Sequence, residues 1–144
     1  MRGVNIKAIT IGALVTAVLI LLIAIGFLFW HGSALFAEEL SDDESSAVIA
    51  ALFQRTDVLV VTTLLGAATN TIGAYVTARI ARNAPMLNVV VYAALSVAAG
   101  VLFFDADLPV WFNVLSFAVI VPAAYAGARL ADRKTSVAPA VMPQ

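Results

Sequence analysis

Four long apolar runs alternate with polar segments along this chain of 144 residues. The runs cover residues 8–30, 58–80, 86–104 and 109–131, and none has an Asp, Glu, Lys or His in its interior. A helix needs about 20 mainly apolar residues to cross a hydrocarbon core roughly 30 Å thick. The pattern therefore predicts an all-α protein with a single membrane domain of four transmembrane helices. The composition, 62% hydrophobic and 12% charged, is too apolar for a soluble chain of this length to bury.

The charged residues are sorted by sign between the two sides that these spans define. Seven of the eight basic residues share one side, and eight of the nine acids share the other, with Arg55 and Asp132 as the exceptions. The basic side holds Arg2, Lys7, Arg79, Arg82, Arg129, Arg133 and Lys134, and the acidic side holds Glu38, Glu39, Asp42, Asp43, Glu44, Asp57, Asp105 and Asp107. Lys and Arg in short loops mark the cytoplasmic side. We therefore expect cytoplasmic N- and C-termini, in a bacterial inner membrane. The first apolar run is too long for a typical cleaved signal peptide, and its cleavage would break this sorting.

One sequence motif occurs twice. The stretch AYVTARIA at 74–81 is matched by AYAGARLA at 124–131, an offset of 50 residues that also pairs Asp57 with Asp107. We interpret the first two spans as one helical hairpin and the last two as its copy. Two-span units keep the same direction in a membrane, so the pattern predicts two tandem parallel repeats related by a pseudo-two-fold axis along the membrane normal.

Small and polar residues recur at helical spacing on the spans. Lipid tails are as apolar as leucine, so membrane helices associate through close contact at small residues and through cross-helix hydrogen bonds. Thr16 and Tyr92 also fall on these predicted inward faces, whereas the bulky stretches 19–23 and 58–61 are expected to face lipid or a partner. The candidates for helix packing, or for lining a path, are Thr62, Gly66, Thr69, Asn70, Gly73, Thr77, Ser96, Gly100, Asn113 and Gly127.

Two amides and one proline need separate comment. Asn70 and Asn113 are amides at depth, and each needs a hydrogen-bond partner. An interhelical bond is the favoured interpretation, and a ligand contact is the alternative. Pro122 lies inside the fourth span and predicts a kink in that helix.

The long loop between the first two spans predicts a short amphipathic helix at 42–54. Ser41 can cap this helix and Glu44 completes an S-x-x-E capping box. Val48, Ile49, Leu52 and Phe53 follow at helical spacing as an apolar stripe. The stripe fits either a packing lid for the bundle or a docking surface for another protein. The tail at 135–144 is expected to be disordered.

Few residues here could carry catalysis. The chain has one histidine and no cysteine, which excludes disulfides, thiolate metal sites and bis-histidine haem ligation within it. No carboxylate falls in the middle of a span, where proton-coupled transport would need one. We therefore expect no enzymatic activity, no catalytic residues, no cofactor, no metal and no nucleic-acid partner. Four arginines at the predicted headgroup level are candidates for anionic-lipid contact: Arg79, Arg82, Arg129 and Arg133.

The run GAYVTARIARNAP, followed by a third span and by a PVWFN entry to a fourth span ending in GARLA, resembles a known group of proteins. These are small, uncharacterised four-span bacterial membrane proteins that carry a G-[GA]-Y-x-[AT]-A-R-I-A signature. The resemblance covers about residues 58–131. It implies the four-span topology and no assigned activity.

Three functions fit the sequence. The first is a non-catalytic accessory or assembly subunit of a larger membrane complex. The second is a small homo-oligomeric transporter or channel, with Thr62, Thr69, Asn70 and Thr77 lining a path. The third is anionic-lipid binding. The expected partners are membrane lipids and another membrane protein or a second copy of the chain. A water-accessible cavity that reaches Asn70 would favour transport.

Overall fold

The computed structural model describes residues 3–36, 41–102, 104 and 106–135, and this part of the chain is helical with no strand. Its helices are α1 (Ile6–Phe36), α2 (Asp42–Phe53), α3 (Thr56–Ile80), α4 (Pro85–Leu102) and α5 (Val110–Thr135). All except α2 are long and apolar enough to cross a membrane, which confirms the prediction of four such helices. α1 extends beyond the predicted span at both ends. The predicted tail lies outside the described residues, apart from Thr135 at the end of α5.

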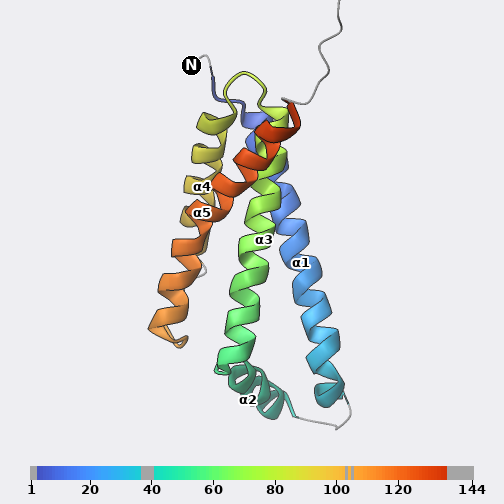
Figure 1. Ribbon diagram of the computed structural model, residues 1–144. Helices are drawn as coiled ribbons and strands as arrows, with labels where there is room; N and C mark the ends of the chain where they lie inside the picture. The colour runs from blue at the N-terminus through green and yellow to red at the C-terminus, as the bar shows by residue number, and fades with distance from the viewer. Residues whose placement is uncertain (1–2, 37–40, 103, 105, 136–144) are drawn as a thin grey trace, which may run out of the picture.

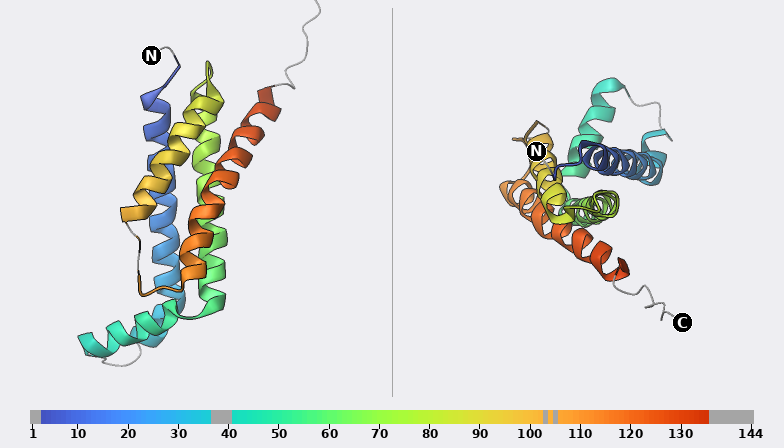
Figure 2. Two further views of the ribbon diagram at one scale, coloured as in Figure 1. Left: turned by 90° about the vertical axis from the view of Figure 1, so that its left-hand side faces the viewer. Right: turned by 90° about the horizontal axis from the view of Figure 1, so that it is seen from above.

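The four long helices form a bundle around α3, which packs against α1, α4 and α5 (Figure 1). α1 and α4 run in one direction, and α3 and α5 run back (Figure 1). One end of the bundle holds the start of α1, the α3–α4 turn and the end of α5, and we call it the terminal end. The opposite end holds α2, the start of α3 and the α4–α5 connection, and we call it the α2 end. α2 lies across this end, at a steep angle to the other helices (Figure 2).

The main cluster of buried hydrophobic residues lies toward the terminal end, and alanines make up most of it. Where α3 meets α5, Ala74 and Ala128 are almost fully buried. A Cβ added at Gly127 would press on the Thr71 carbonyl and lie 2.9 Å from the Tyr75 nitrogen. The α3–α5 contact is therefore close backbone packing of the kind that small residues allow in membranes.

The α1–α3 contact is equally close. A Cβ added at Gly12 would overlap Thr77, and one added at Gly73 would overlap Thr16 and Tyr92. Thr77 is fully buried, and its hydroxyl donates to the Gly73 carbonyl at 2.9 Å. Thr69, Gly73 and Thr77, spaced four residues apart on α3, thus lie on its small-residue face, and both threonine hydroxyls donate within the helix.

The α2 end is more loosely built. α4 has 18 residues against 25 in α3. In the connection from α4 to α5, the described residues 104 and 106–109 are not helical. The two hairpins are joined here by Gln54, whose Nε2 donates to the Asp107 carbonyl at 3.0 Å. α5 bends along its length and contains Pro122, as the sequence predicts (Figure 1).

The expectation that residues 58–61 face lipid or a partner is wrong for two of them, whereas Val60 and Val61 are 41% and 50% exposed, as expected. Val58 and Leu59, expected to face lipid or a partner, are 4% and 0% exposed. They lie at the start of α3, and α2 packs against this helix. The hydrogen bond from Gln54 also holds the α4–α5 connection near this point. Leu21 and Leu22 are more than half exposed, as expected for the corresponding stretch of α1.

The capping box at the start of α2 is formed as the sequence predicts. The Ser41 N–H donates to the Glu44 carboxylate at 2.9 Å, and the Glu44 N–H donates to Ser41 Oγ at 3.4 Å. The donated backbone and hydroxyl bonds from Ser41 hold the pKa of Glu44 below its usual value. The helix therefore has a defined start, although it is exposed.

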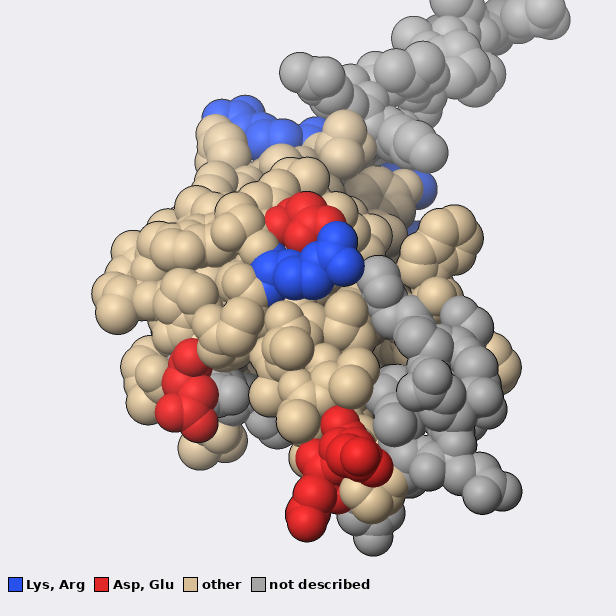
Figure 3. Space-filling model, turned by 90° about the horizontal axis from the view of Figure 1, so that it is seen from below, with Lys and Arg blue, Asp and Glu red and all other residues tan. Residues whose placement is uncertain are grey.

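The charges that are sorted along the sequence are also sorted in space. The terminal end carries Lys7, Arg79, Arg82 and Arg129, with Asp132 the one described acid there. The α2 end carries Asp43, Glu44, Asp57 and Asp107, with Arg55 the one described basic residue. Seen from the α2 end, acidic side chains lie at several separate places on the surface (Figure 3). Arg55 is paired there with Asp57, at 2.8 Å.

Candidate functional site

A layer of three polar side chains crosses the bundle partway along its length. Tyr92 of α4 is 1% exposed, and its hydroxyl lies 2.7 Å from Thr16 Oγ1 of α1. The same hydroxyl donates to Asn70 Oδ1 of α3 at 3.3 Å. This polar layer (Thr16, Asn70 and Tyr92) therefore joins three helices through side-chain hydrogen bonds.

The polar layer is satisfied within the chain. Thr16 has a single hydroxyl hydrogen, which can go to the Tyr92 hydroxyl or to the Gly12 carbonyl at 3.1 Å, and Asn70 Nδ2 donates to the Gly66 carbonyl at 3.0 Å. Among the described residues that are not exposed, no buried side-chain nitrogen or oxygen lacks a hydrogen-bond partner. Asn70 thus has the interhelical partner that the sequence analysis favoured, and it belongs to the packing of the bundle.

A cavity of about 490 Å³ lies between the polar layer and the α2 end, and it is called the chamber below. All four long helices contribute to it, and its walls are mainly apolar. The apolar lining includes Ile20, Ile23, Leu65, Phe112, Phe117 and Ile120, and the polar lining includes Thr62, Thr63, Thr69, Asn70, Asn113 and Ser116.

Several polar groups of the chamber are already bonded to their own backbone. Thr62 and Thr63 each donate to the carbonyl four residues earlier at 2.9 Å, and Thr69 donates to the Gly66 carbonyl at 2.9 Å. Asn113 Nδ2 donates to the Leu108 carbonyl at 3.4 Å. These hydroxyl hydrogens are used within the helix, so the threonines contribute little polar character to the chamber.

A smaller cavity of about 270 Å³ lies under α2 and shares part of its lining with the chamber, including Ile20 and Leu65. Ile49 and Phe53 of the α2 stripe line it, and Phe53 stacks on Phe27 of α1 with ring centroids 6.1 Å apart. The stripe therefore faces the bundle. Val48, Ile49 and Phe53 are still 37–40% exposed, so the bundle covers the stripe only in part.

The predicted small residues divide into close contacts and open positions. Gly12, Gly73 and Gly127 lie in close backbone contacts, and a Cβ added at Gly100 would lie 2.9 Å from the Phe117 ring. Gly66 is different, because a Cβ there meets no atom within 4 Å, and Gly66 lines the chamber. Ser96 is partly buried on α4.

The predicted path-lining residues do not share one cavity. Thr62, Thr69 and Asn70 line the chamber, but Thr77 does not, and its hydroxyl lies in the α1–α3 contact. The chamber thus reaches Asn70 and ends there. Beyond the polar layer, toward the terminal end, Gly12 and Gly73 bring the backbones of α1 and α3 into close contact.

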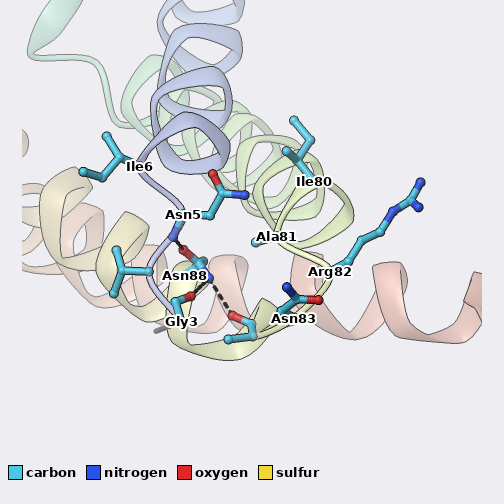
Figure 4. Close-up of a pocket in the computed structure, with 10 residues that line it drawn as sticks. Gly3, Asn5, Ile6, Ile80, Ala81, Arg82, Asn83 and Asn88 are labelled. Carbon is cyan, nitrogen blue, oxygen red and sulfur yellow. Dashed lines mark hydrogen bonds between the residues drawn. The ribbon is translucent and has the colours of Figure 1, made fainter. Parts of the chain in front are cut away.

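Asn88 is a buried polar residue that the sequence analysis did not single out. It is fully buried near the start of α4, where Nδ2 donates to the Gly3 and Ala84 carbonyls at 2.8 and 2.7 Å. Its Oδ1 accepts from the Asn5 N–H at 2.6 Å (Figure 4). The only signal for this role is an amide one turn inside an apolar run. Asn88 fastens the segment before α1 to the α3–α4 turn.

A surface pocket of about 580 Å³ lies beside Asn88 and is lined by Asn5, Ala81 and Arg82 among others (Figure 4). The Arg82 side chain extends away from Asn88 (Figure 4). Arg129, another candidate for lipid contact, donates from Nε to the Tyr125 hydroxyl at 2.7 Å and lies over that ring. Arg79 is exposed, and the Arg133 side chain lies outside the described part of the structure.

Comparison with known proteins adds no relative. No protein-family model matches the chain, and no curated protein or solved structure matches it significantly. The signature-based resemblance of residues 58–131 therefore stays a prediction. Within the described residues, no group of three or more His, Cys, Asp or Glu side chains could hold a metal ion.

Proposed function

We propose that the chain is a non-catalytic integral membrane bundle that serves as an accessory or assembly subunit of a larger membrane complex. The observation that carries this proposal is the closed half of the bundle. Gly12, Gly73 and Gly127 bring the helix backbones into contact there, and the polar layer satisfies its own hydrogen bonds. A bundle built in this way acts through its surfaces.

The proposed orientation places the terminal end in the cytoplasm and the α2 end on the outer side. Its support is the excess of Lys and Arg at the terminal end and of Asp and Glu at the α2 end. We also propose that α1–α3 and α4–α5 are parallel repeats. In support, Ala74 and Ala124 are 0% and 1% exposed, and Ala78 and Ala128 are 4% and 1% exposed, at the same offset of 50 residues.

The proposed docking surface is α2. Its apolar stripe is only partly covered by the bundle, and Asp43 and Glu44 are exposed at its start. The exposed acids favour a partner of opposite charge. We therefore propose that α2 binds a membrane protein that has basic residues at its outer surface and an apolar patch beside them. Opposite charges at such a contact speed association and select the partner more than they add affinity.

The chamber gives the transport hypothesis its one specific support, because it reaches Asn70. A path through one subunit would still have to pass Tyr92 and the Gly12–Gly73 contact. Transport in this account would therefore require a passage between subunits of a homo-oligomer. It remains the second candidate.

The test is the composition of the complex in native membranes. Tagged protein is extracted in mild detergent, and the intact complex is weighed by mass spectrometry. We expect a defined larger partner in stoichiometric amount. Asp43→Lys should reduce the recovered partner several-fold, and Asp132→Lys, the same charge change at the opposite end, should not. Recovery of the chain alone, or only as a homo-oligomer, would contradict the accessory role. Solute flux in liposomes that Asn70→Leu abolishes would favour transport.

A further inference from the structure

The depth of the chamber is close to that of one bilayer leaflet. Its lining on α3 runs from Thr62 to Asn70, a stretch of nine residues with a rise of about 12 Å along the helix. One leaflet of a bilayer contributes about 15 Å of hydrocarbon. In the proposed orientation this half of the bundle faces the outer leaflet, and the polar layer forms the floor of the chamber near the bilayer midplane.

The lining selects hydrocarbon over a polar ligand. Ile20, Leu65 and Phe117 form much of the wall, and the hydroxyls of Thr62 and Thr63 are bonded to their own helix. An unfilled apolar space loses the dispersion contacts of its walls. In a bilayer, a neighbouring acyl chain can restore these contacts, and no water has to be removed from the chain or from the cavity wall.

The half-height of the chamber distinguishes a lipid tail from a partner helix. A transmembrane helix crosses both leaflets, so a groove that receives one would continue past the polar layer. Beyond that layer Gly73 lies in contact with Gly12 and Thr16, and Gly127 lies against the α3 backbone. An acyl chain needs only one leaflet, and the chamber has that depth.

Charges of both signs lie at the α2 end, seven and five residues before Thr62, the first residue of α3 that lines the chamber. Arg55 and Asp57 pair at the start of α3, with side chains 56% and 66% exposed. An exposed ion pair contributes little to stability, so its two members can exchange partners at low cost. A zwitterionic headgroup complements the pair, because its phosphate can take Arg55 and its ammonium group can take Asp57. An anionic headgroup would satisfy only Arg55.

We propose that the chamber is a binding site for one acyl chain of an outer-leaflet phospholipid with an amine-bearing, zwitterionic headgroup. The proposal rests on the orientation proposed above and not on the accessory role. The lipid would complete the packing of the bundle on the side where α4 ends before α3. Gly66, whose Cβ position is open, is the place where the protein leaves room for that chain.

Gly66→Leu is the decisive variant, and Gly26→Leu is its matched control. A Cβ meets no atom within 4 Å at either glycine, so both replacements should leave the fold intact. Only Gly66 lines a described cavity, and a leucine there would project into the space of the acyl chain. Circular dichroism and thermal unfolding check that both variants fold like the original protein.

The measurement is native mass spectrometry of the protein purified from vesicles of equal phosphatidylethanolamine and phosphatidylglycerol. We expect one retained phosphatidylethanolamine per chain in the original protein and in Gly26→Leu, and at least a fivefold loss in Gly66→Leu. Arg55→Gln with Asp57→Asn should reduce the preference for the amine headgroup to near parity. Lipid retention in Gly66→Leu equal to that of the original protein would overturn the site.

A preference for phosphatidylglycerol would overturn the headgroup assignment. A dimer that Gly66→Leu disrupts would identify a second copy of the chain as the occupant. The mass of any partner complex should be the same in both glycine variants, which separates this test from that of the accessory role.

Discussion

Two glycines on the same helix should respond in opposite ways to replacement by alanine. Gly66 and Gly73 lie two helical turns apart on α3, and only Gly73 is packed against α1. Alanine stabilises a helix by about 0.5–1 kcal/mol relative to glycine, and both replacements gain this term. At Gly73 the new methyl group would overlap Thr16 and Tyr92 and would lie 2.9 Å from the Gly12 carbonyl oxygen.

The cost at Gly73 follows from these contacts. Overpacking a tight interior costs about 1–3 kcal/mol. Separating Thr16 from Tyr92 adds about 1 kcal/mol, the scale of a membrane hydrogen bond. After the helix term is subtracted, Gly73→Ala should lose about 1–3 kcal/mol of unfolding free energy. Gly66→Ala should gain about 0.5–1 kcal/mol, because its methyl group enters open space.

Reversible unfolding in mixed micelles, followed by far-ultraviolet circular dichroism, measures both changes. A difference of about 2 kcal/mol changes the unfolding equilibrium constant about thirtyfold, well above experimental scatter. Equal stability of the two variants, or a loss at Gly66 as large as that at Gly73, would refute the assignment of a closed and an open half of α3.

Three further predictions concern polar groups. Tyr92→Phe should cost about 1 kcal/mol in the same unfolding assay, because it removes the hydroxyl that joins three helices, whereas the exposed Tyr125→Phe should cost almost nothing; equal costs would contradict the polar layer. Asn88→Leu should cost about 2 kcal/mol and speed hydrogen exchange at the Asn5 amide, because that amide loses its acceptor; unchanged exchange would contradict the fastening role. The pKa of Glu44 is lowered in the folded protein because its ionised carboxylate accepts hydrogen bonds from Ser41. The ionised carboxylate therefore stabilises the start of α2 fully above about pH 4.5, the usual glutamate pKa, and this stabilisation is lost as the pH falls through the folded-state pKa. Carbon chemical shifts of α2 should then move toward random-coil values in acid, and Glu44→Gln should remove that dependence.

The sequence was enough for the helices because their signals are local. Each span is a continuous apolar run, and the capping box of Ser41 and Glu44 needs only residues three apart. The sign of the charges in each connection likewise requires no knowledge of the fold. These features place the helices within four residues of their observed bounds, except at the end of α1, which continues six residues beyond the predicted span to Phe36.

The pairing of helices could be predicted only in part, since it depends on partners far apart along the chain. Thr16 and Tyr92 fall on predicted inward faces, but nothing in the sequence pairs residues 76 positions apart. Asn88 looked like an ordinary residue near a span end, although its partners include the Gly3 carbonyl. Val58 was placed wrongly because a bulky apolar residue looks the same whether lipid or protein covers it.

The chamber could not be predicted because it results from a difference between two hairpins. α4 stops short of the length of α3, and the remaining connection is held at the α2 end by Gln54. Small residues recur at helical spacing along α3 on both sides of the polar layer, so the sequence pattern does not distinguish the packed side from the open side. Only the placement of α1 and α5 distinguishes Gly73, which is packed, from Gly66, which is open.

The most direct test of the central claim is the mass of the intact complex, extracted in mild detergent from the membranes in which the protein is naturally made. We predict a defined assembly that contains this chain and a larger membrane protein in fixed stoichiometry, and Asp43→Lys should reduce the amount of partner recovered. A chain recovered only alone or with copies of itself, unaffected by that substitution, would contradict the accessory role.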